Sequence, residues 1–245
     1  MKGKSISNNW DLIWEEKLSP DTHDLLIDLV KKYSPGKKIL EVGFGTAGDL
    51  CLLNKLGFDC YGLELSRVAY KNAMKNKELK IFFGDGEKTR FASNQFDLIF
   101  HQGVLEHFRN PECLIKEHRR ILKDGGVVVV DIPHKWNLFT LYKKYFQFFG
   151  KWYGGWERSY SSYELRDLIE RNGFLPLGIF YRGIFPHQWG KFLFPHSIVN
   201  NKVVKRLLTK TPFRFIQKFA RLFYGKSRLM QIVSSYNIII VARKK

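Results

Sequence analysis

The sequence predicts a doubly wound α/β fold, in which a mostly parallel sheet carries helices on both faces. Short apolar runs alternate with helix-like segments through the first half of the chain, starting with the run over residues 38–42. That run leads into a glycine-rich turn and then into leucines at near-helical spacing. The run Val127–Val130 is apolar at every position, which is typical of a central parallel strand covered on both sides. These observations favour one sheet with helical crossovers between its strands.

The expected elements follow one another with clear start and stop signals. Asn9 begins a short helix to about residue 18, and Ser19-Pro20 begins a second helix that ends before Ser34. Later helices begin at Ser66, Pro111 and Ser161. Seven strands are expected, over residues 38–42, 58–65, 79–83, 96–101, 127–130, 174–181 and 236–242. We expect residues 1–36 to form N-terminal helices, residues 37–180 and 235–245 the α/β core, and residues 181–234 an insertion.

Composition places the chain among globular proteins of a reducing compartment. Its 245 residues are 44% hydrophobic and 26% charged, enough for one large α/β domain or a domain with an appendage. The three cysteines show no C-x-x-C spacing, which indicates free thiols rather than a disulfide framework or a zinc site. The first twenty residues hold no apolar leader, and the charge-free window over 229–242 is too polar to span a bilayer. We therefore expect a cytoplasmic protein.

Charge divides the chain into two unlike halves. Residues 1–135 hold 21 lysines and arginines against 19 acidic residues, whereas residues 136–245 hold 20 against 4. Nearly all of the net charge of +18 therefore lies in the second half, and no acidic residue follows Glu170. Such a basic surface suits an anionic partner.

The basic half also carries many aromatic side chains. Residues 136–156 are rich in phenylalanine, tyrosine and tryptophan, and we expect them to form a lid over an acceptor. Residues 202–224 form two amphipathic helical patterns, with basic residues opposite bulky apolar ones. This pattern suits a helix in an anionic membrane interface, RNA binding, or ordinary packing on the sheet. We favour the membrane surface, because no recognised RNA-binding module flanks the core.

A ligand site is expected beyond the carboxyl ends of the strands. The glycine turn at Gly43 and Gly45 follows the first strand, Glu64 ends the second, and Asp85 follows the third. The spacing suits either a nicotinamide dinucleotide or S-adenosyl-L-methionine. Glu41 discriminates between them, because a carboxylate before the turn opposes a pyrophosphate but suits an ammonium and a sulfonium.

Here the sequence resembles the class I S-adenosylmethionine-dependent methyltransferases. The resemblance rests on motifs that occur in order over residues 37–133: Glu41-Val-Gly43-Phe-Gly45, Glu64, Gly84-Asp85, Phe96–Ile99 with Val104–His107, and Leu122–Gly126. It resumes with the 161–173 helix and a final antiparallel hairpin, and it implies a Rossmann-like sheet. The family's third glycine is replaced by Ala47, which is small enough for binding to survive.

The resemblance also implies residue roles. Gly43 and Gly45 let the backbone approach the methionine part of S-adenosyl-L-methionine, and Glu41 lies near its amino group. Glu64 holds the ribose and Asp85 the adenine amine. The remaining contacts are the Gly86 backbone against the adenine ring and the Gln102 carbonyl at the amino group.

Methyl transfer to a hydroxyl usually needs a base as well as alignment. His107, Glu106, His101 and His134 all fall near strand ends, and we choose His107 because a near-neutral pKa suits proton removal. A structural role for His107 is an equal alternative. We expect no metal, because no cluster has ligand spacing.

The sequence thus favours a methyltransferase that acts on an oxygen of a small or lipid-like acceptor. We expect it to be a peripheral protein at the inner face of a membrane. It loosely resembles the methyltransferases of quinone and lipid biosynthesis. Two alternatives stay open: an RNA methyltransferase that uses the basic half, and an inactive cofactor-binding scaffold. The acceptor and the oligomeric state do not follow from the sequence.

Overall fold

The computed structural model describes residues 10–11, 14, 22–150, 152, 156–183 and 235–245 of the chain. Its helices are α2 (Asp24–Tyr33), α3 (Gly48–Lys55), α4 (Arg67–Ala73), α5 (Pro111–Ile121), α6 (Leu138–Phe148) and α7 (Ser162–Arg171), with the 3₁₀ turn η1 (Leu105–His107). Its strands are β1 (Lys38–Val42), β2 (Asp59–Glu64), β3 (Lys80–Phe83), β4 (Phe96–Gln102), β5 (Leu122–Pro133), β6 (Phe174–Arg182) and β7 (Asn237–Lys244). Most of the first predicted helix and nearly all of the predicted insertion lie outside the described residues.

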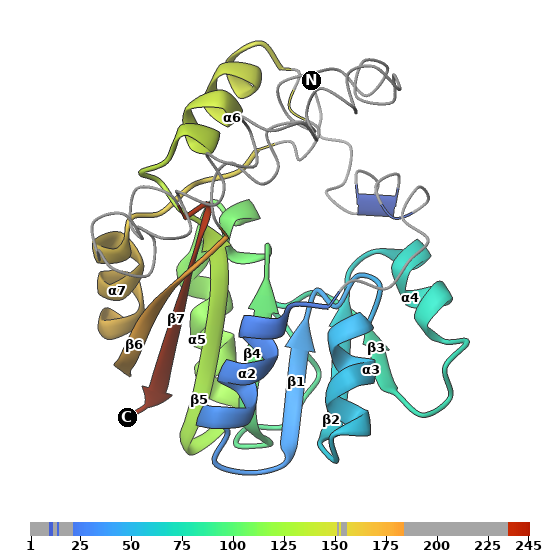
Figure 1. Cartoon of the computed structure of the whole chain (residues 1–245). Coiled ribbons are helices and arrows are strands. Elements are labelled where there is room, and N and C mark those ends of the chain that lie inside the picture. The colour runs from blue at the N-terminus through green and yellow to red at the C-terminus, as the bar shows by residue number, and fades with distance from the viewer. Residues whose placement is uncertain (1–9, 12–13, 15–21, 151, 153–155, 184–234) are drawn as a thin grey trace, which may run out of the picture.

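The seven strands form one sheet in the order β3-β2-β1-β4-β5-β7-β6 (Figure 1). Neighbouring strands run parallel except at β7, which is antiparallel to both β5 and β6. The predicted doubly wound, seven-stranded sheet with its C-terminal antiparallel hairpin is thereby confirmed. Strand order reverses between β1 and β4, so a ligand is expected beyond the carboxyl ends of these two strands.

Helices cover both faces of the sheet (Figure 1). On one face, α2, α3 and α4 bury an apolar cluster that includes Leu26, Leu50 and Ala73. On the other face, α5 and α7 bury a second cluster through Leu114 and Leu168. The valines of β5 alternate between the two clusters, which explains why this strand is apolar at successive positions.

The predicted helix starts are built from the expected caps. The Ser66 side chain accepts a hydrogen bond from the Ala69 amide at 3.2 Å, at the start of α4. Ser161 and Glu164 form a reciprocal capping box at α7, with bonds of 3.2 and 2.8 Å. Pro111 occupies the first turn of α5. Local side chains therefore fix where these helices begin.

The strand expected over residues 127–130 begins earlier, at Leu122, and contains a bulge. Leu122 pairs with Phe96, and pairing resumes with Val127 opposite Leu98, so the residues between them loop out of the ladder. Gly125 has a φ of +73°, a left-handed conformation that favours glycine and allows the bulge. The strand therefore begins five residues before the apolar run.

Two further boundaries differ from the sequence prediction. α2 begins at Asp24, after the predicted start at Ser19-Pro20. The residue before it, His23, is tied to α3, since its amide and Nδ1 lie 2.8 and 2.7 Å from the Asp49 carboxylate. β6 continues to Arg182, because its pairing with β7 extends to Asn237.

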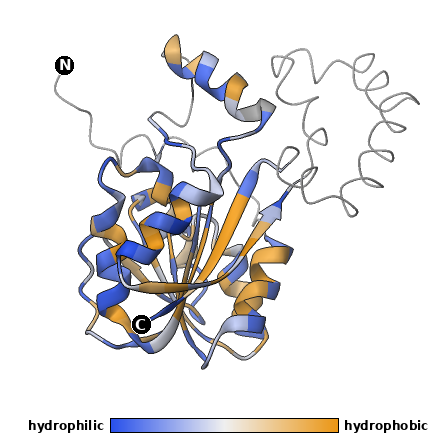
Figure 2. Cartoon of the chain, turned by 90° about the vertical axis from the view of Figure 1, so that its left-hand side faces the viewer, coloured by the Kyte–Doolittle hydropathy of each residue, from blue (hydrophilic) through white to orange (hydrophobic). Residues whose placement is uncertain are grey.

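α6 lies beyond the carboxyl ends of the strands, apart from the helical layers (Figures 1 and 2). Among the α6 side chains whose burial is described, the buried ones are polar: Thr140 is fully buried, and Lys143 is 1% exposed. Three of its apolar side chains face outward, with Leu141, Tyr145 and Phe148 exposed by 62, 60 and 86%. Among the described residues, no helix is both long and apolar enough to cross a bilayer.

Candidate active site

The turn after β1 has a shape that requires glycine at two positions. Gly43 and Gly45 have φ angles of +71° and +53°. A Cβ on Gly43 would lie 2.5 Å from a Val104 methyl carbon, and one on Gly45 would lie 2.4 Å from the Trp14 ring. Ala47 follows at φ +57° and precedes α3. The turn therefore leaves bare backbone at the switch point of the sheet.

Glu64, at the end of β2, is hydrogen-bonded to this turn. Its Oε2 accepts from the Gly45 amide at 2.9 Å, and its Oε1 accepts from the Leu65 and Ser66 amides at 2.8 Å each. Burial raises the pKa of the Glu64 carboxyl, and the three amide donors oppose that rise. The predicted carboxylate therefore lies at the carboxyl ends of β1 and β2.

Glu41 is a buried carboxylate that forms no ion pair with any residue the structure describes. It is 4% exposed, and its Oε2 has no hydrogen-bond partner in the described part of the chain. Burial raises the pKa of Glu41 well above its usual range, and the charges of Asp49 and Glu64 raise it further. Buried acceptors are normally satisfied, so this one fits a ligand that brings a cationic donor. An anionic group such as a pyrophosphate does not fit beside three carboxylates.

Asp85 and Gly86 follow β3 at the same edge of the sheet. Asp85 is exposed, and its Oδ1 accepts a hydrogen bond from the Glu87 amide at 2.9 Å. Gly86 is buried, and a Cβ there would lie 2.8 Å from Leu114 of α5. The loop therefore passes directly against α5 at Gly86.

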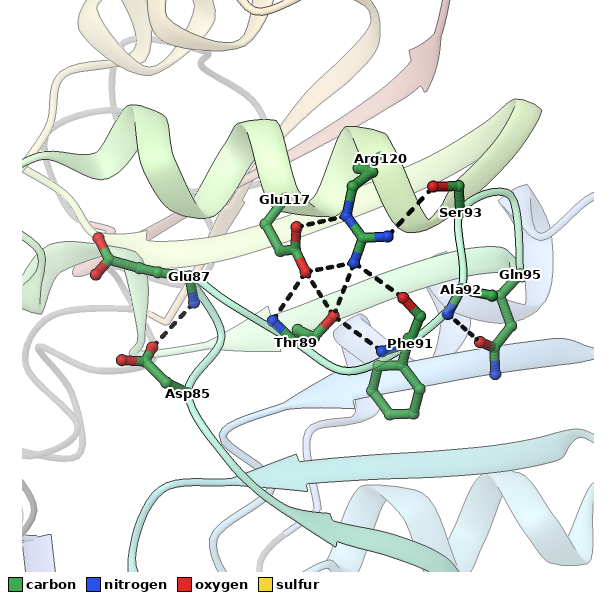
Figure 3. A network of polar contacts seen from close by, with 9 residues as sticks. All are labelled: Asp85, Glu87, Thr89, Phe91, Ala92, Ser93, Gln95, Glu117 and Arg120. Atoms are coloured by element: carbon green, nitrogen blue, oxygen red, sulfur yellow. Dashed lines mark hydrogen bonds and ion pairs between the residues drawn. The ribbon is translucent and has the colours of Figure 1, made fainter.

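A polar network fixes the rest of this loop to α5 (Figure 3). Glu117 of α5 accepts from the Thr89 amide at 2.8 Å and from the Thr89 hydroxyl at 2.6 Å. Arg120 lies 2.7 Å from Glu117 and donates to the Phe91 carbonyl at 2.9 Å and the Ser93 hydroxyl at 3.2 Å. α5 therefore sets the position of the segment that holds Asp85.

Gln102 ends β4 and leads the chain towards η1. Its Oε1 is buried and has no hydrogen-bond partner among the described residues. Gly103 follows at φ +67°, and its amide donates to the Asp131 carbonyl of β5 at 3.0 Å. Gln102 therefore offers a second unsatisfied acceptor at the carboxyl ends of the strands.

η1 carries the adjacent pair Glu106 and His107. Glu106 is 3% exposed, and its Oε1 lies 3.6 Å from the position that a Cβ on Gly103 would take. Burial raises the pKa of Glu106 to about 8. His107 Nδ1 lies 3.3 Å from the Trp156 carbonyl, and its ring meets the Trp10 ring edge-on at 4.7 Å. Burial lowers the pKa of His107, so its ring is neutral near pH 7.

The other two histidines weighed as a base lie within packed structure. His101 is fully buried in β4, with its ring centroid 5.3 Å from that of His118 in α5. Burial lowers the pKa of His101 well below its usual range. His134 is buried after β5 and forms a backbone bridge with Tyr160. His101 therefore belongs to the contact between β4 and α5, whereas Glu106 and His107 lie in the loop after β4.

Residues near the N-terminus also contact the site, which the sequence analysis did not predict. Asp11 accepts hydrogen bonds from the Ser66 hydroxyl at 2.6 Å and from the Val68 amide at 3.2 Å. Trp14 lies against Gly45 of the turn. The only signal for these contacts was a pair of tryptophans four residues apart in a helix-like segment. Such spacing is equally common on a helix that packs elsewhere.

Fold and site together define a class of protein. A family model described as a methyltransferase domain matches residues 40–130, from β1 into β5. This stretch contains the glycine turn and Glu41, Glu64 and the Glu106-His107 pair. Residues 40–130 therefore match a methyltransferase domain, and the seven-stranded sheet has the fold of solved S-adenosylmethionine-dependent methyltransferases. Among the described residues, no three side chains of the metal-binding types come together as an ion site.

Named relatives share about half of this chain. Demethylmenaquinone methyltransferase of Corynebacterium glutamicum is 31% identical over 114 residues, which are 45% of this chain and 49% of that protein. Sterol 24-C-methyltransferase ERG6B of Gibberella zeae is 31% identical over 117 residues, 44% of this chain and 30% of that protein. The chain thus spans half or less of the length of these curated relatives.

A solved structure extends the likeness of the fold. Phosphoethanolamine N-methyltransferase 2 of Haemonchus contortus, in complex with phosphomonomethylethanolamine and S-adenosylhomocysteine, superposes with a TM-score of 0.64 at 16% identity. The match covers 100% of this chain and 61% of that one. At this identity, the likeness concerns the fold alone.

Proposed function

We propose that this protein transfers a methyl group from S-adenosyl-L-methionine to oxygen of a small or lipid-like acceptor, at the surface of an anionic membrane. Glu41 is the observation that carries the proposal. A buried carboxylate whose Oε2 has no partner among the described residues, beside a turn that requires glycine, needs a ligand with a cationic donor. The ammonium and sulfonium of S-adenosyl-L-methionine meet that need.

The residues at the carboxyl ends of the strands divide the binding of this cofactor. Gly43 and Gly45 admit the methionine part, with Glu41 at its amino group and the Gln102 carbonyl beside it. These two residues would supply the acceptors that the ammonium requires, because each carries a buried oxygen with no partner in the described part of the chain. The Glu64 carboxylate would exchange amide contacts for the ribose hydroxyls.

The adenine would lie along the loop that follows β3. Asp85 would accept from its amine, since the Asp85 carboxylate is exposed and, in the described part of the chain, accepts a hydrogen bond only from the Glu87 amide. The Gly86 backbone would line the ring. The hydrogen bonds of Glu117 and Arg120 support this assignment, because they fix the loop after β3 against α5.

The protein's chemical task is to align the acceptor and to receive a proton. When bound, S-adenosyl-L-methionine supplies an electrophilic methyl group on sulfur. The acceptor oxygen bonds to that methyl carbon as the sulfur–methyl bond breaks, and the hydroxyl proton passes to His107. His107 Nδ1 faces the Trp156 carbonyl, so this nitrogen holds the ring proton and Nε2 is the basic atom.

A lipid-like acceptor has support from the named relatives and from α6. Those relatives are named for demethylmenaquinone and a sterol, both largely apolar molecules. α6 exposes Leu141, Tyr145 and Phe148 beyond the end of the sheet where the cofactor would bind. Exposed aromatic residues of this kind favour a membrane interface, and the basic second half favours anionic lipid.

Transfer of a radiolabelled methyl group tests the proposal. The protein and methyl-labelled S-adenosyl-L-methionine are incubated with quinol, sterol, phosphoethanolamine and RNA in separate reactions. We expect label in an apolar product, and its loss in His107→Gln with cofactor binding retained. Label found only in RNA would contradict the acceptor class, and no label with any acceptor would favour the inactive scaffold.

Flotation on vesicles tests the membrane part separately. We expect the protein to float with vesicles that contain phosphatidylglycerol and to remain behind with neutral phosphatidylcholine vesicles. Replacement of the lysines and arginines in residues 202–221 by glutamine should abolish flotation. Equal recovery on both vesicle types would count against the electrostatic part of the proposal.

A further inference from the structure

A second group of buried polar atoms without partners lies away from the glycine turn. In the described part of the chain this group comprises Glu106 Oε2, Ser159 Oγ, Tyr160 OH and Arg182 Nε. Buried polar atoms are nearly always paired in folded proteins, so several together need an explanation. They come from η1, from the segment before α7 and from the end of β6.

Backbone contacts bring these elements together around the end of β5. The Arg158 amide donates to the Glu106 carbonyl at 2.9 Å, which joins the 156–160 segment to η1. The Tyr160 amide donates to the Pro133 carbonyl at 3.2 Å, and the Lys135 amide donates to the Tyr160 carbonyl at 2.8 Å. The 156–160 segment therefore runs between η1 and the end of β5.

β6 reaches the same place through an ion pair. Arg182 Nη2 lies 2.7 Å from Asp131 Oδ2, and the other Asp131 oxygen accepts from Asn237 at 2.6 Å. The Asp131 carbonyl also accepts from Gly103, the residue over which Glu106 folds. Arg182 and Glu106 therefore approach the end of β5 from opposite sides, β6 and η1.

The anionic side chains around these groups are already paired with cations. Asp131 is paired with Arg182, and Lys143 of α6 is paired with Glu157 at 3.0 Å. Arg158, whose guanidinium lies 4.8 Å from the centre of the Tyr160 ring, shares Glu164 with Lys135. Burial raises the pKa of Glu106 to about 8, so its carboxyl is neutral at pH 7. What remains without a partner is a set of hydrogen-bond donors: a carboxylic acid, a phenol and one guanidinium N–H.

We propose that Glu106, Tyr160 and Arg182 bind the polar head of the acceptor, and that this head is uncharged and carries oxygen atoms that accept hydrogen bonds. The inference rests on the proposed methyl transfer and names the acceptor class more narrowly. Hydroxyl and carbonyl oxygens satisfy all three donors. A quaternary or primary ammonium satisfies none of them and would need an anion that the charge balance does not leave free.

Equilibrium binding of two probes tests this class of acceptor. The full-length protein is first saturated with S-adenosylhomocysteine, and tryptophan fluorescence then follows titration with 1,4-dihydroxynaphthalene or with phosphoethanolamine. We expect the uncharged dihydroxy ring to bind and the charged amine to bind at least tenfold more weakly. Equal affinities, or no binding of the ring, would overturn the proposal.

Matched variants connect this binding to the named side chains. Tyr160→Phe and Glu106→Leu should each weaken binding of 1,4-dihydroxynaphthalene about tenfold, since each removes one hydrogen bond to the ligand. Glu106→Gln keeps a donor and should restore most of the affinity. Tyr163→Phe is the control, because Tyr163 lies on α7 with 84% of its surface exposed. Unchanged affinity in the first two variants would contradict the proposal.

Thermal unfolding separates a binding role from a structural one. The Tyr160 hydroxyl has no partner among the described residues, so Tyr160→Phe should leave the midpoint of unfolding unchanged or raise it. A lower midpoint would show that the hydroxyl serves the fold instead. Calorimetry with S-adenosylhomocysteine separates the acceptor proposal from the methyl-transfer proposal on which it rests. If the protein does not bind S-adenosylhomocysteine, the methyl-transfer proposal fails. If it binds S-adenosylhomocysteine but not the dihydroxy ring, only the acceptor proposal fails.

Discussion

Single residues at the end of β1 show how local sequence builds a binding site at some cost to the fold. Glu41 is buried near Asp49 and Glu64. Their negative charges repel that of an ionised Glu41, so these carboxylates do not stabilise the fold by attracting one another. Such an arrangement is typical of a site kept for a ligand rather than for packing. The residue is therefore a direct place to separate stability from binding.

Replacing Glu41 with glutamine should separate those two properties. Glu41→Gln removes a buried acid beside two carboxylates, so the free energy of unfolding should rise by about 1 kcal/mol. Affinity for S-adenosyl-L-methionine should fall roughly tenfold, because a bound ammonium would stabilise the ionised form of the Glu41 carboxyl, whereas glutamine cannot ionise. Urea unfolding and titration calorimetry measure the two effects. The exposed Glu78→Gln variant is the control, and unchanged cofactor affinity in Glu41→Gln would refute the assignment.

Glu106 should make stability depend on pH in a defined direction. Its pKa is about 8 in the folded protein, against about 4.3 for an unfolded glutamate. The folded state therefore binds the proton more tightly, and the stability this contributes is present at low pH and lost as pH rises towards 8. Glu106→Gln should become the more stable protein above pH 8, by up to a few kcal/mol.

Unfolding in urea at pH 5, 7 and 9 checks this effect of Glu106. The difference between Glu106→Gln and the wild type should grow with pH. Glu112→Gln, on the outer side of α5, serves as the control and should show no such trend. A constant difference across the three pH values would argue that the Glu106 carboxyl is not held neutral by burial.

At the residue scale, the sequence predicts what neighbours along the chain determine. Gly43 and Gly45 follow from the turn itself, and Glu64 is found at the turn because β2 pairs with β1. The contributions of Tyr160 and Arg182 could not be predicted. They depend on contacts of the 156–160 segment and of β6 with the end of β5. These contacts join residues that are far apart in the sequence, so no local pattern predicts them.

At the scale of elements, α5 determines where the loop after β3 lies. Glu117→Gln should weaken the bonds to Thr89 and Arg120 that hold this loop (Figure 3). We expect affinity for S-adenosyl-L-methionine to fall about threefold to tenfold, because ordering the loop must then accompany binding. The free energy of unfolding should fall by only about 1 kcal/mol.

Calorimetry and hydrogen exchange together check the role of this loop. Amides of residues 84–91 should exchange faster in Glu117→Gln than in the wild type. Lys116→Ala is the matched control on α5, since Lys116 lies on the exposed side of the helix and, within the described residues, pairs only with Glu112. Faster exchange without any loss of affinity would mean that the loop does not contribute to cofactor binding.

Element prediction succeeded where periodicity and caps agreed. The strands of the core and the starts of α4, α5 and α7 follow from apolar runs bounded by serine or proline. The bulge in β5 was not foreseen, because Gly125 in a left-handed conformation serves a turn and a bulge equally well. The orientation of α6 was also hidden, since Lys143, a residue type usually exposed, is buried there in an ion pair with Glu157.

At the scale of the whole molecule, the proposed cofactor site lies in the near-neutral first half of the chain, whereas nearly all of the net positive charge lies in the second half. The net charge of +18 predicts long-range attraction to anionic surfaces. Binding to vesicles that contain phosphatidylglycerol should therefore weaken steeply between low and physiological salt, over which the screening length shortens to about 8 Å. Salt-independent binding would point to insertion of the apolar face of α6 alone.

The most direct test of the central claim is titration calorimetry of the wild type and Glu64→Gln with S-adenosyl-L-methionine. We predict one binding site per chain in the wild type. We predict affinity at least tenfold lower in Glu64→Gln, since the amide cannot accept both ribose hydroxyls as a carboxylate does. Circular dichroism should show that Glu64→Gln is folded. Absence of binding by the wild type, or equal affinity in the folded variant, would contradict the claim that this edge of the sheet holds the methyl donor.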